Sequence, residues 1–163
     1  MAQTRRTRQV VGWGFGLLAG VGAGVVAALA GLAVGAVMRS NVPPPHFVAW
    51  SAFAAGVLGG VLYAWVSRLT DRPAPALWII TLALATIDSA LIAFLPMPAG
   101  ASPVRLPIVG LIVPLRQIAA LVGIGRLGER HFPAANLAAD TLMHYTTAVA
   151  VALLVPAWAR RRI

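Results

Sequence analysis

Four long runs of apolar residues, separated by short segments rich in proline and charge, constrain this chain more than any other feature. The runs cover residues 10–38, 47–67, 76–95 and 134–158. A helix needs about 20 apolar residues to cross the hydrocarbon core of a bilayer, and lipid offers no partner to an unpaired backbone group. The sequence therefore predicts an all-α integral membrane protein, a four-helix bundle that forms one transmembrane domain over residues 10–159.

The composition agrees with lipid as the solvent. Hydrophobic residues make up 60% of the chain and charged residues only 10%, whereas soluble domains carry roughly 25% charged residues. The first run has 29 residues, from 10 to 38, while the apolar part of a cleavable signal peptide has roughly 7 to 15. We therefore expect this run to be retained as a membrane anchor.

The charges flank the apolar runs. All thirteen cationic residues are arginines, and six of them lie in two basic tails, residues 1–9 and 160–163. No stacking aromatic residues are interleaved with them, so the pattern favours anionic lipid headgroups over nucleic acid as the partner. Four crossings put both tails on the same side as Arg68 and Arg72. The positive-inside rule then predicts cytoplasmic termini in the cytoplasmic, or inner, membrane.

The segment 105–130, between the third and fourth runs, is apolar but interrupted by Pro107 and Pro114. On a continuous helix its four arginines fall within an arc of about 80°. They are Arg105, Arg116, Arg126 and Arg130, and we expect Ile108, Leu111, Ile112, Leu115, Ile118 and Val122 to form the apolar face of the same helix. This pattern favours an amphipathic helix that lies in the interface before the last helix, with a re-entrant segment as the second choice. A fifth crossing would send the C-terminal arginines outside.

Small residues recur at every fourth position of the first two runs. They are Gly12, Gly16, Gly20 and Gly24 in the first run and Ala52, Gly56, Gly60 and Ala64 in the second. Because lipid tails are as apolar as leucine, membrane helices associate through close backbone approach, which such stripes permit. We expect both stripes to face another transmembrane helix, within the chain, in a second copy or in a different protein.

Asp88 is the single charged residue between Ala76 and Pro96, near the middle of the third run. An ionised carboxylate at the bilayer centre costs about 2.5 to 3.5 kcal/mol. We therefore expect Asp88 to face the interior of the bundle, where Arg116, His144 or a neighbouring hydroxyl group can reach it, or to remain protonated.

Asp140 and His144 lie four residues apart on the last run and therefore share one face of a helix. Three interpretations stay open. The pair fits a structural contact that fixes the register of the helices, a proton or small-ligand site shared with Asp88, or a metal or pigment held by His144.

No catalytic motif accompanies these residues. The chain has no cysteine, which excludes disulfides, thiolate nucleophiles and cysteine-ligated metals. The glycines of GFGLLAG lie inside an apolar run rather than after a strand, so they do not form a dinucleotide-binding motif. We therefore predict a protein without enzymatic activity, and the sequence indicates no cofactor and no metal.

Short motifs in the last run carry a resemblance to a known family. Leu142, Met143 and His144 lie near its start, and Val155 and Pro156 precede the basic residues at its end. Together with SRLTDRPAP, which joins the second and third runs, they resemble an uncharacterised family of small four-helix bacterial membrane proteins. The resemblance implies a bacterial four-helix membrane fold, and the family brings no assigned activity. The segment 105–130 departs from the family pattern.

Two functions fit these observations. The preferred hypothesis is an accessory or structural subunit that packs through its small-residue helix faces within a membrane complex or homo-oligomer. The alternative is a small proton-linked transporter or carrier that uses buried Asp88, Asp140 and His144.

Overall fold

A computed structural model describes residues 10–39, 44–100 and 109–160 of the chain. In this part the secondary structure is helical, apart from one isolated bridge between Pro98 and Leu127. The helices are α1 (Trp13–Val37), α2 (Pro45–Leu69), α3 (Pro73–Phe94), α4 (Val109–Leu121) and α5 (Ala134–Arg160). All but α4 are long and apolar enough to cross a membrane. The prediction of an all-α four-helix membrane bundle is confirmed.

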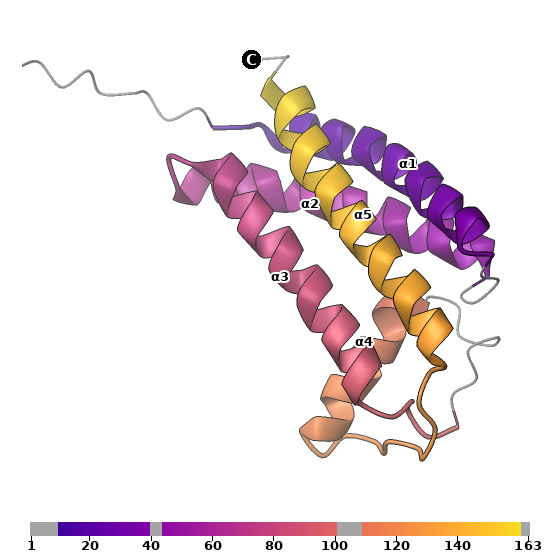
Figure 1. The fold of residues 1–163 in the computed structure, drawn as a ribbon. Coiled ribbons are helices and arrows are strands. Elements are labelled where there is room, and N and C mark those ends of the chain that lie inside the picture. The colour runs from indigo at the N-terminus through magenta and orange to yellow at the C-terminus, as the bar shows by residue number, and fades with distance from the viewer. Residues whose placement is uncertain (1–9, 40–43, 101–108, 161–163) are drawn as a thin grey trace, which may run out of the picture.

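The four long helices run alternately up and down, so α1 begins and α5 ends at the same end of the bundle (Figure 1). This end, which also holds the connection between α2 and α3, is called the tail end. The opposite end is called the α4 end, because α4 lies there (Figure 1). Helices α1 and α2 pack side by side, and α5 packs against α1, α2 and α3. Residues of α5 can therefore meet residues of every other long helix.

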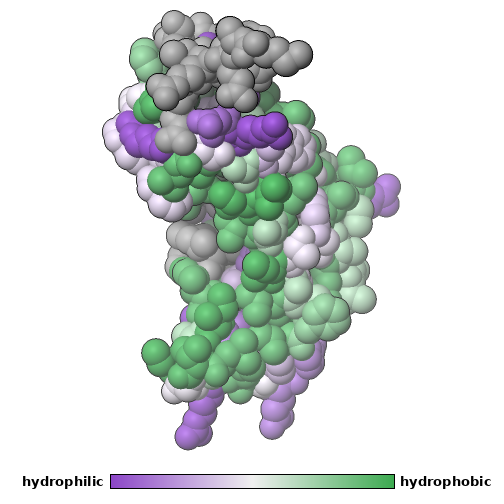
Figure 2. Space-filling model, turned by 90° about the vertical axis from the view of Figure 1, so that its left-hand side faces the viewer, coloured by the Kyte–Doolittle hydropathy of each residue, from purple (hydrophilic) through white to green (hydrophobic). Residues whose placement is uncertain are grey.

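Large apolar side chains cover the outside of the bundle. Leu18 and Leu29 of α1 are 63% exposed, and Ile79 and Phe94 of α3 are 70% and 80% exposed. Figure 2 shows one face of the molecule, with a broad hydrophobic surface between hydrophilic residues at both ends. An apolar belt of this kind is unfavourable in water and is what lipid covers. The protein is therefore an integral membrane protein.

Prolines begin two of the helices. Pro45 and Pro73 are the first residues of α2 and α3. A proline at this position loses no helical hydrogen bond, because the first N–H groups of a helix have no partner within it. The proline-rich connections therefore end one helix and start the next within a few residues.

The backbones of α1 and α2 approach closely along the two small-residue stripes. A Cβ atom added to Gly16 would lie 2.6 Å from the carbonyl oxygen of Gly60, and one added to Gly20 would lie 2.7 Å from that of Gly56. One added to Gly24 would meet a carbonyl oxygen of α2 at 2.6 Å. No side chain fits at these distances, so the glycines permit the contact. The two stripes meet each other within one chain.

The ends of the predicted stripes behave differently. Ala64 is fully buried and lies at the α1–α2 contact. Ala52 is also buried, and it lines a cavity between α2 and α5. Gly12 does not take part in the packing, because it precedes α1 and is exposed. A Cβ atom added to Gly12 would meet only Phe15, which lies in the first turn of α1 and not in α2. The stripe of α1 therefore starts one turn later than its sequence pattern suggests.

The segment 105–130 does not form one continuous amphipathic helix. Its helix ends at Leu121, and Gly123 and Gly125 follow with positive φ angles. This left-handed backbone suits glycine and terminates a helix. Arg126 and Arg130 therefore lie beyond α4 and share no helix with Arg116, so the predicted single helical stripe is wrong for these residues. Arg105 lies outside the described residues. The prediction extended helical periodicity through the two glycines that end the helix.

Helix α4 packs on the bundle through residues outside its predicted apolar face. Val113 and Gln117, one turn apart, are fully buried. Leu115 and Ile118, which belong to the predicted apolar face, are 55% and 42% exposed. Ile112 of the predicted face packs against the cluster of Val113, whereas Leu115 and Ile118 lie on the outer side of α4. The bundle holds α4 mainly by its Val113 and Gln117 face.

The contacts of α4 close the α4 end of the bundle. Val113 packs in a cluster with Ile92 of α3 and Phe132 before α5, against which Phe47 of α2 also packs. The Gln117 Nε2 atom donates hydrogen bonds of 3.1 Å to two carbonyl oxygens, those of Leu95 and Pro96 directly after α3. Helix α4 thus joins the ends of three membrane-spanning helices.

Candidate functional site

Two carboxylates from different helices flank one imidazole inside the bundle. Nε2 of His144 on α5 lies 2.9 Å from Oδ2 of Asp88 on α3. Nδ1 of the same ring lies 3.3 Å from Oδ2 of Asp140, one turn earlier on α5. The side chains of Asp88 and His144 are 20% exposed and that of Asp140 is 11% exposed. Asp88, Asp140 and His144 are called the acid–histidine cluster below.

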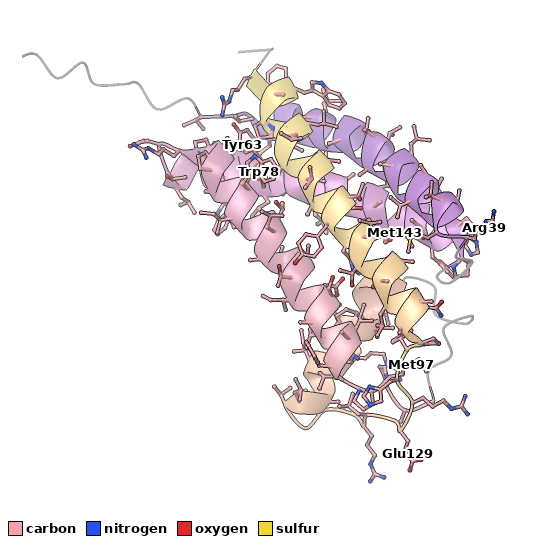
Figure 3. The ribbon with its side chains drawn as sticks, in the orientation of Figure 1. Arg39, Tyr63, Trp78, Met97, Glu129 and Met143 are labelled. Atoms are coloured by element: carbon pink, nitrogen blue, oxygen red, sulfur yellow. The ribbon has the colours of Figure 1, made fainter. Side chains whose placement is uncertain are left out.

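The helices place the cluster nearer the α4 end than the tail end. Asp88 lies six residues before Phe94, the last residue of α3, which is about 9 Å at the rise of an α-helix. His144 lies ten residues after Ala134, the first residue of α5, or about 15 Å. Met143, labelled in Figure 3, marks this level on α5. The cluster therefore lies on the α4 side of the middle of both helices.

The two contacts of His144 differ in kind. The 2.9 Å contact with Asp88 has the length of a charge-assisted hydrogen bond. Nδ1 of His144 and Oδ2 of Asp140 are both buried and have no hydrogen-bond partner. Their 3.3 Å contact is therefore electrostatic and lacks hydrogen-bond geometry. Asp140 keeps the capacity to accept a hydrogen bond from a further donor.

A small cavity of about 20 Å³ lies between α2 and α5, next to the cluster. From α2 and α5, its lining residues are Phe47, Val48, Ser51, Ala52, Asp140, Met143, His144 and Thr147. The cavity combines an apolar wall with hydroxyl, carboxylate and imidazole groups. Asp140 faces this cavity on the α2 side of the cluster, whereas Asp88 reaches His144 from α3.

Arg116 does not join the cluster. It is exposed on α4, and its Nη2 atom lies 3.5 Å from the carbonyl oxygen of Ala99 in the loop after α3. Helix α4 does pack onto the bundle, but it does so through Val113 and Gln117. Arg116 is adjacent to Gln117 and points away from that face. Of the candidate partners for Asp88, the structure brings His144 to it and leaves Arg116 at the α4 end.

Several polar residues near the cluster carry little signal in the sequence. Ser51 lines the cavity from α2, and serine is common in membrane helices as a small packing residue. Thr86 of α3 and Tyr145 of α5 form a hydrogen bond of 2.7 Å on the exposed side of the same helix pair. Tyr145 is adjacent to His144, so a search around the ionisable residues would have found it. Nothing in the sequence distinguishes Ser51 from other small residues.

The geometry does not favour a metal or pigment on His144. Both ring nitrogens face carboxylate oxygens, at 2.9 and 3.3 Å, so neither points to an open coordination position. In the part of the chain that the structure describes, no group of three or more His, Asp or Glu side chains is arranged to hold a metal ion. To act as an axial ligand to a metal, His144 would have to lose its contact with Asp88 or with Asp140.

A second polar group at the tail end has a structural explanation. The backbone N–H of Val11 donates to Oγ of Ser67 at 3.0 Å, and Nη1 of Arg68 donates to the carbonyl oxygen of Val11 at 3.2 Å. The Arg68 guanidinium also lies 4.3 Å from the ring centroid of Trp13. These contacts attach the segment before α1 to the end of α2. They satisfy backbone groups at a helix start.

Comparisons with protein-family models, with curated proteins and with solved structures found no match.

Proposed function

We propose that this membrane protein is a small proton-handling carrier without enzymatic activity, in which the acid–histidine cluster takes up and releases protons. One observation supports the proposal most directly: both ring nitrogens of His144 face carboxylates, at 2.9 and 3.3 Å, within helices long enough to span a membrane. Ionisable side chains inside membrane spans are costly, and they commonly mark proton or ion pathways.

An imidazole suits this role because it accepts a proton on one nitrogen and releases one from the other. Asp140 lies at the cavity side of His144 and Asp88 at the α3 side. The three groups therefore form a short relay across α5 once the 3.3 Å contact between His144 and Asp140 closes into a hydrogen bond. The cavity residues contributed by α2 are not titratable; they are Phe47, Val48, Ser51 and Ala52. The titratable groups at this site are therefore those of the cluster itself.

Proton uptake into liposomes that contain the purified full chain tests the proposal. Uptake is driven by a potassium diffusion potential and followed with an internal pH-sensitive dye. We expect Asp88→Asn and His144→Gln to lower the initial rate by at least about tenfold, because each removes a proton-accepting group from the relay. Both substitutions keep the approximate size and polarity of the side chain, and circular dichroism checks that the variants remain helical.

Glu129→Gln is the matched control, because it makes the same change of charge in an exposed loop at the α4 end, where Figure 3 labels Glu129. Its uptake rate is expected to equal that of the wild type. A wild-type rate in Asp88→Asn, together with a lower unfolding temperature, would assign the cluster to structural packing and exclude the carrier.

An accessory or structural subunit of a membrane complex or homo-oligomer is the second candidate. The small-residue stripes do not support it, because they contact each other within the chain. Its support is the outer face of α1, where Leu18 and Leu29 are exposed and Gly14 has open space around it. Native mass spectrometry after gentle extraction tests this candidate. A stable assembly with itself or with another membrane protein is expected, and a monomer that retains only lipid argues against it.

We place the chain in the inner membrane of a bacterium, with both termini in the cytoplasm and anionic lipid headgroups around the tail end. This orientation is supported by the arginines, since eight of the thirteen belong to the tails and to the loop with Arg68 and Arg72. The resemblance to small four-helix bacterial membrane proteins agrees with this proposed placement.

A further inference from the structure

We infer that the cavity between α2 and α5 binds one small monovalent cation that donates hydrogen bonds, of which ammonium is the simplest. This inference rests on the proposed function, because the cation would be the solute whose movement is coupled to that of protons. The cavity lies against Asp140, on the side of the acid–histidine cluster that faces α2.

The size of the cavity limits the ligand to a single small ion. Its volume is about 20 Å³, and a cavity needs roughly 10 to 15 Å³ on this measure to hold one water molecule. An ammonium ion is close to water in size. An organic cation with several heavy atoms would have to displace the helices.

A buried acceptor in the cavity lacks a donor. Asp140 is only 8% exposed and lines the cavity, and its Oδ2 atom, which lies 3.3 Å from Nδ1 of His144, accepts no hydrogen bond. A buried carboxylate oxygen without a donor costs free energy, so a donor bound in the cavity relieves that cost. The Ser51 hydroxyl donates its own proton to the carbonyl oxygen of Val48 at 3.2 Å. Its oxygen is therefore left as a further acceptor, and Thr147 adds another hydroxyl.

The number of oxygen atoms favours ammonium over a metal ion. Three oxygen-bearing side chains line the cavity, those of Ser51, Asp140 and Thr147. Hard metal ions take six or more oxygen ligands. An ammonium ion needs acceptors only for its four N–H groups, and the ring of Phe47 offers an additional cation–π surface.

The charge of the cluster favours a monovalent ion. Two carboxylates flank one imidazole, so the cluster keeps one negative charge when His144 carries a proton and both carboxylates are ionised. One monovalent cation brings the sum to zero, which is the least costly state within a membrane. A divalent ion would leave an excess positive charge.

Thermal unfolding of the purified full chain in detergent tests the site. The probe is ammonium chloride, compared with potassium chloride at the same ionic strength, since potassium ions have a similar radius but no hydrogen-bond donors. A ligand that binds only the folded state raises the unfolding temperature. We expect a saturable rise in ammonium that is absent in potassium. Binding is measured rather than transport, because uncharged ammonia crosses bilayers without a carrier.

Variants that remove a hydroxyl group from the cavity test whether the rise in unfolding temperature arises at this site. Thr147→Val is expected to abolish the ammonium-specific rise, and Thr146→Val is the matched control, because Thr146 is the preceding residue and does not line the cavity. Ser51→Ala is the second variant if Thr147→Val does not fold. An equal rise in both salts, or an unchanged ammonium effect in both Ser51→Ala and Thr147→Val, overturns the inference.

The two proposals fail separately. Proton uptake in potassium medium that depends on Asp88, without any ammonium effect on unfolding, removes the cation site and leaves the proton carrier. Ammonium-specific stabilisation without proton uptake leaves a cation-binding site and removes the carrier.

Discussion

A histidine whose two ring nitrogens both contact carboxylates has no ring nitrogen left for another partner. His144 is in this position, with Asp88 and Asp140 at 2.9 and 3.3 Å. Polar contacts between membrane helices nevertheless contribute little to stability, about 0.6 kcal/mol on average and about 1.7 kcal/mol at most. The reason is that side chains of the unfolded chain also find partners in the membrane. Substitutions in the cluster should therefore change its chemistry more than the fold.

A double-mutant cycle measures the contact between Asp88 and His144. We expect Asp88→Asn and His144→Gln to couple by about 1 kcal/mol in the free energy of unfolding, in line with polar contacts in membranes. Reversible unfolding in mixed micelles, followed by circular dichroism, gives the four values. Ser67→Ala at the tail end is the control, and its effect should add to that of Asp88→Asn within about 0.5 kcal/mol. Strict additivity of Asp88→Asn and His144→Gln would contradict the contact.

One of the two contacts in the acid–histidine cluster follows from the sequence alone. Asp140 and His144 are four residues apart on one helix, so their proximity is a property of helical geometry. Asp88 lies 56 residues before His144, and their contact depends on how α3 is placed along α5. That placement results from side-chain packing over both helices. The sequence therefore left three partners open for Asp88, and the fold selected His144.

The contact between α1 and α2 makes the stripe glycines sensitive to the smallest side chain. Gly20→Ala puts a Cβ atom 2.7 Å from the carbonyl oxygen of Gly56, a backbone atom that cannot rotate away. Overpacking of this kind costs about 1 to 3 kcal/mol, against a gain of about 1 kcal/mol from replacing glycine in a helix. We expect Gly20→Ala to lower the free energy of unfolding of the monomer, measured in mixed micelles.

Gly14→Ala is the matched control on the same helix. No atom lies within 4 Å of a Cβ atom added to Gly14, so alanine gains helix propensity without a steric cost. This variant should be as stable as the wild type or more stable. Equal effects of Gly14→Ala and Gly20→Ala would mean that α1 and α2 do not pack through these glycines.

Helix α4 depends on one buried amide. Gln117→Leu removes the donor to the carbonyl oxygens of Leu95 and Pro96, at a cost of about 1 to 3 kcal/mol. We expect amide hydrogen exchange to become at least about tenfold faster at Met97 and Ala99, whose N–H groups bond to the loop after α4. Mass spectrometry of exchanged peptides measures this change.

The effect should be confined to the α4 end. Exchange in α1 and α2 is expected to stay at the wild-type rate, because these helices contact each other through the glycine stripes. Ile118→Ala, next to Gln117 but 42% exposed, is the control and should leave the exchange of Met97 unchanged. Equal exchange in Gln117→Leu and the wild type would show that α4 is held by its other contacts.

Helix α4 was the element least accessible to sequence reasoning. Its apolar residues occur on more than one face, and the charges of 105–130 suggested a single helix. The length of α4 depended on Gly123 and Gly125, which end the helix. The face by which α4 packs depended on the buried Gln117, which bonds to a loop that is more than 20 residues away in the sequence. Periodicity shows which residues share a face but not which face another element covers.

At the scale of the whole molecule, the even number of spanning helices puts the start of α1 and the end of α5 at the tail end (Figure 1). If the tail end is cytoplasmic, a membrane-impermeant maleimide should label His131→Cys in intact cells and Thr70→Cys only after permeabilisation. The chain has no cysteine of its own, so the unsubstituted protein is the background control. The opposite pattern of labelling would place the termini outside.

The sequence by itself determined the solvent of this protein, the number of its long helices and the common end of the bundle at which the first begins and the last finishes. These properties depend on the length of apolar runs and on the count of crossings, which are local or additive. Only the tertiary structure decided that the small-residue stripes face each other, that Arg116 stays at the α4 end and that Asp88 meets His144. These contacts depend on the relative placement of helices, which is fixed by the packing of many side chains at once.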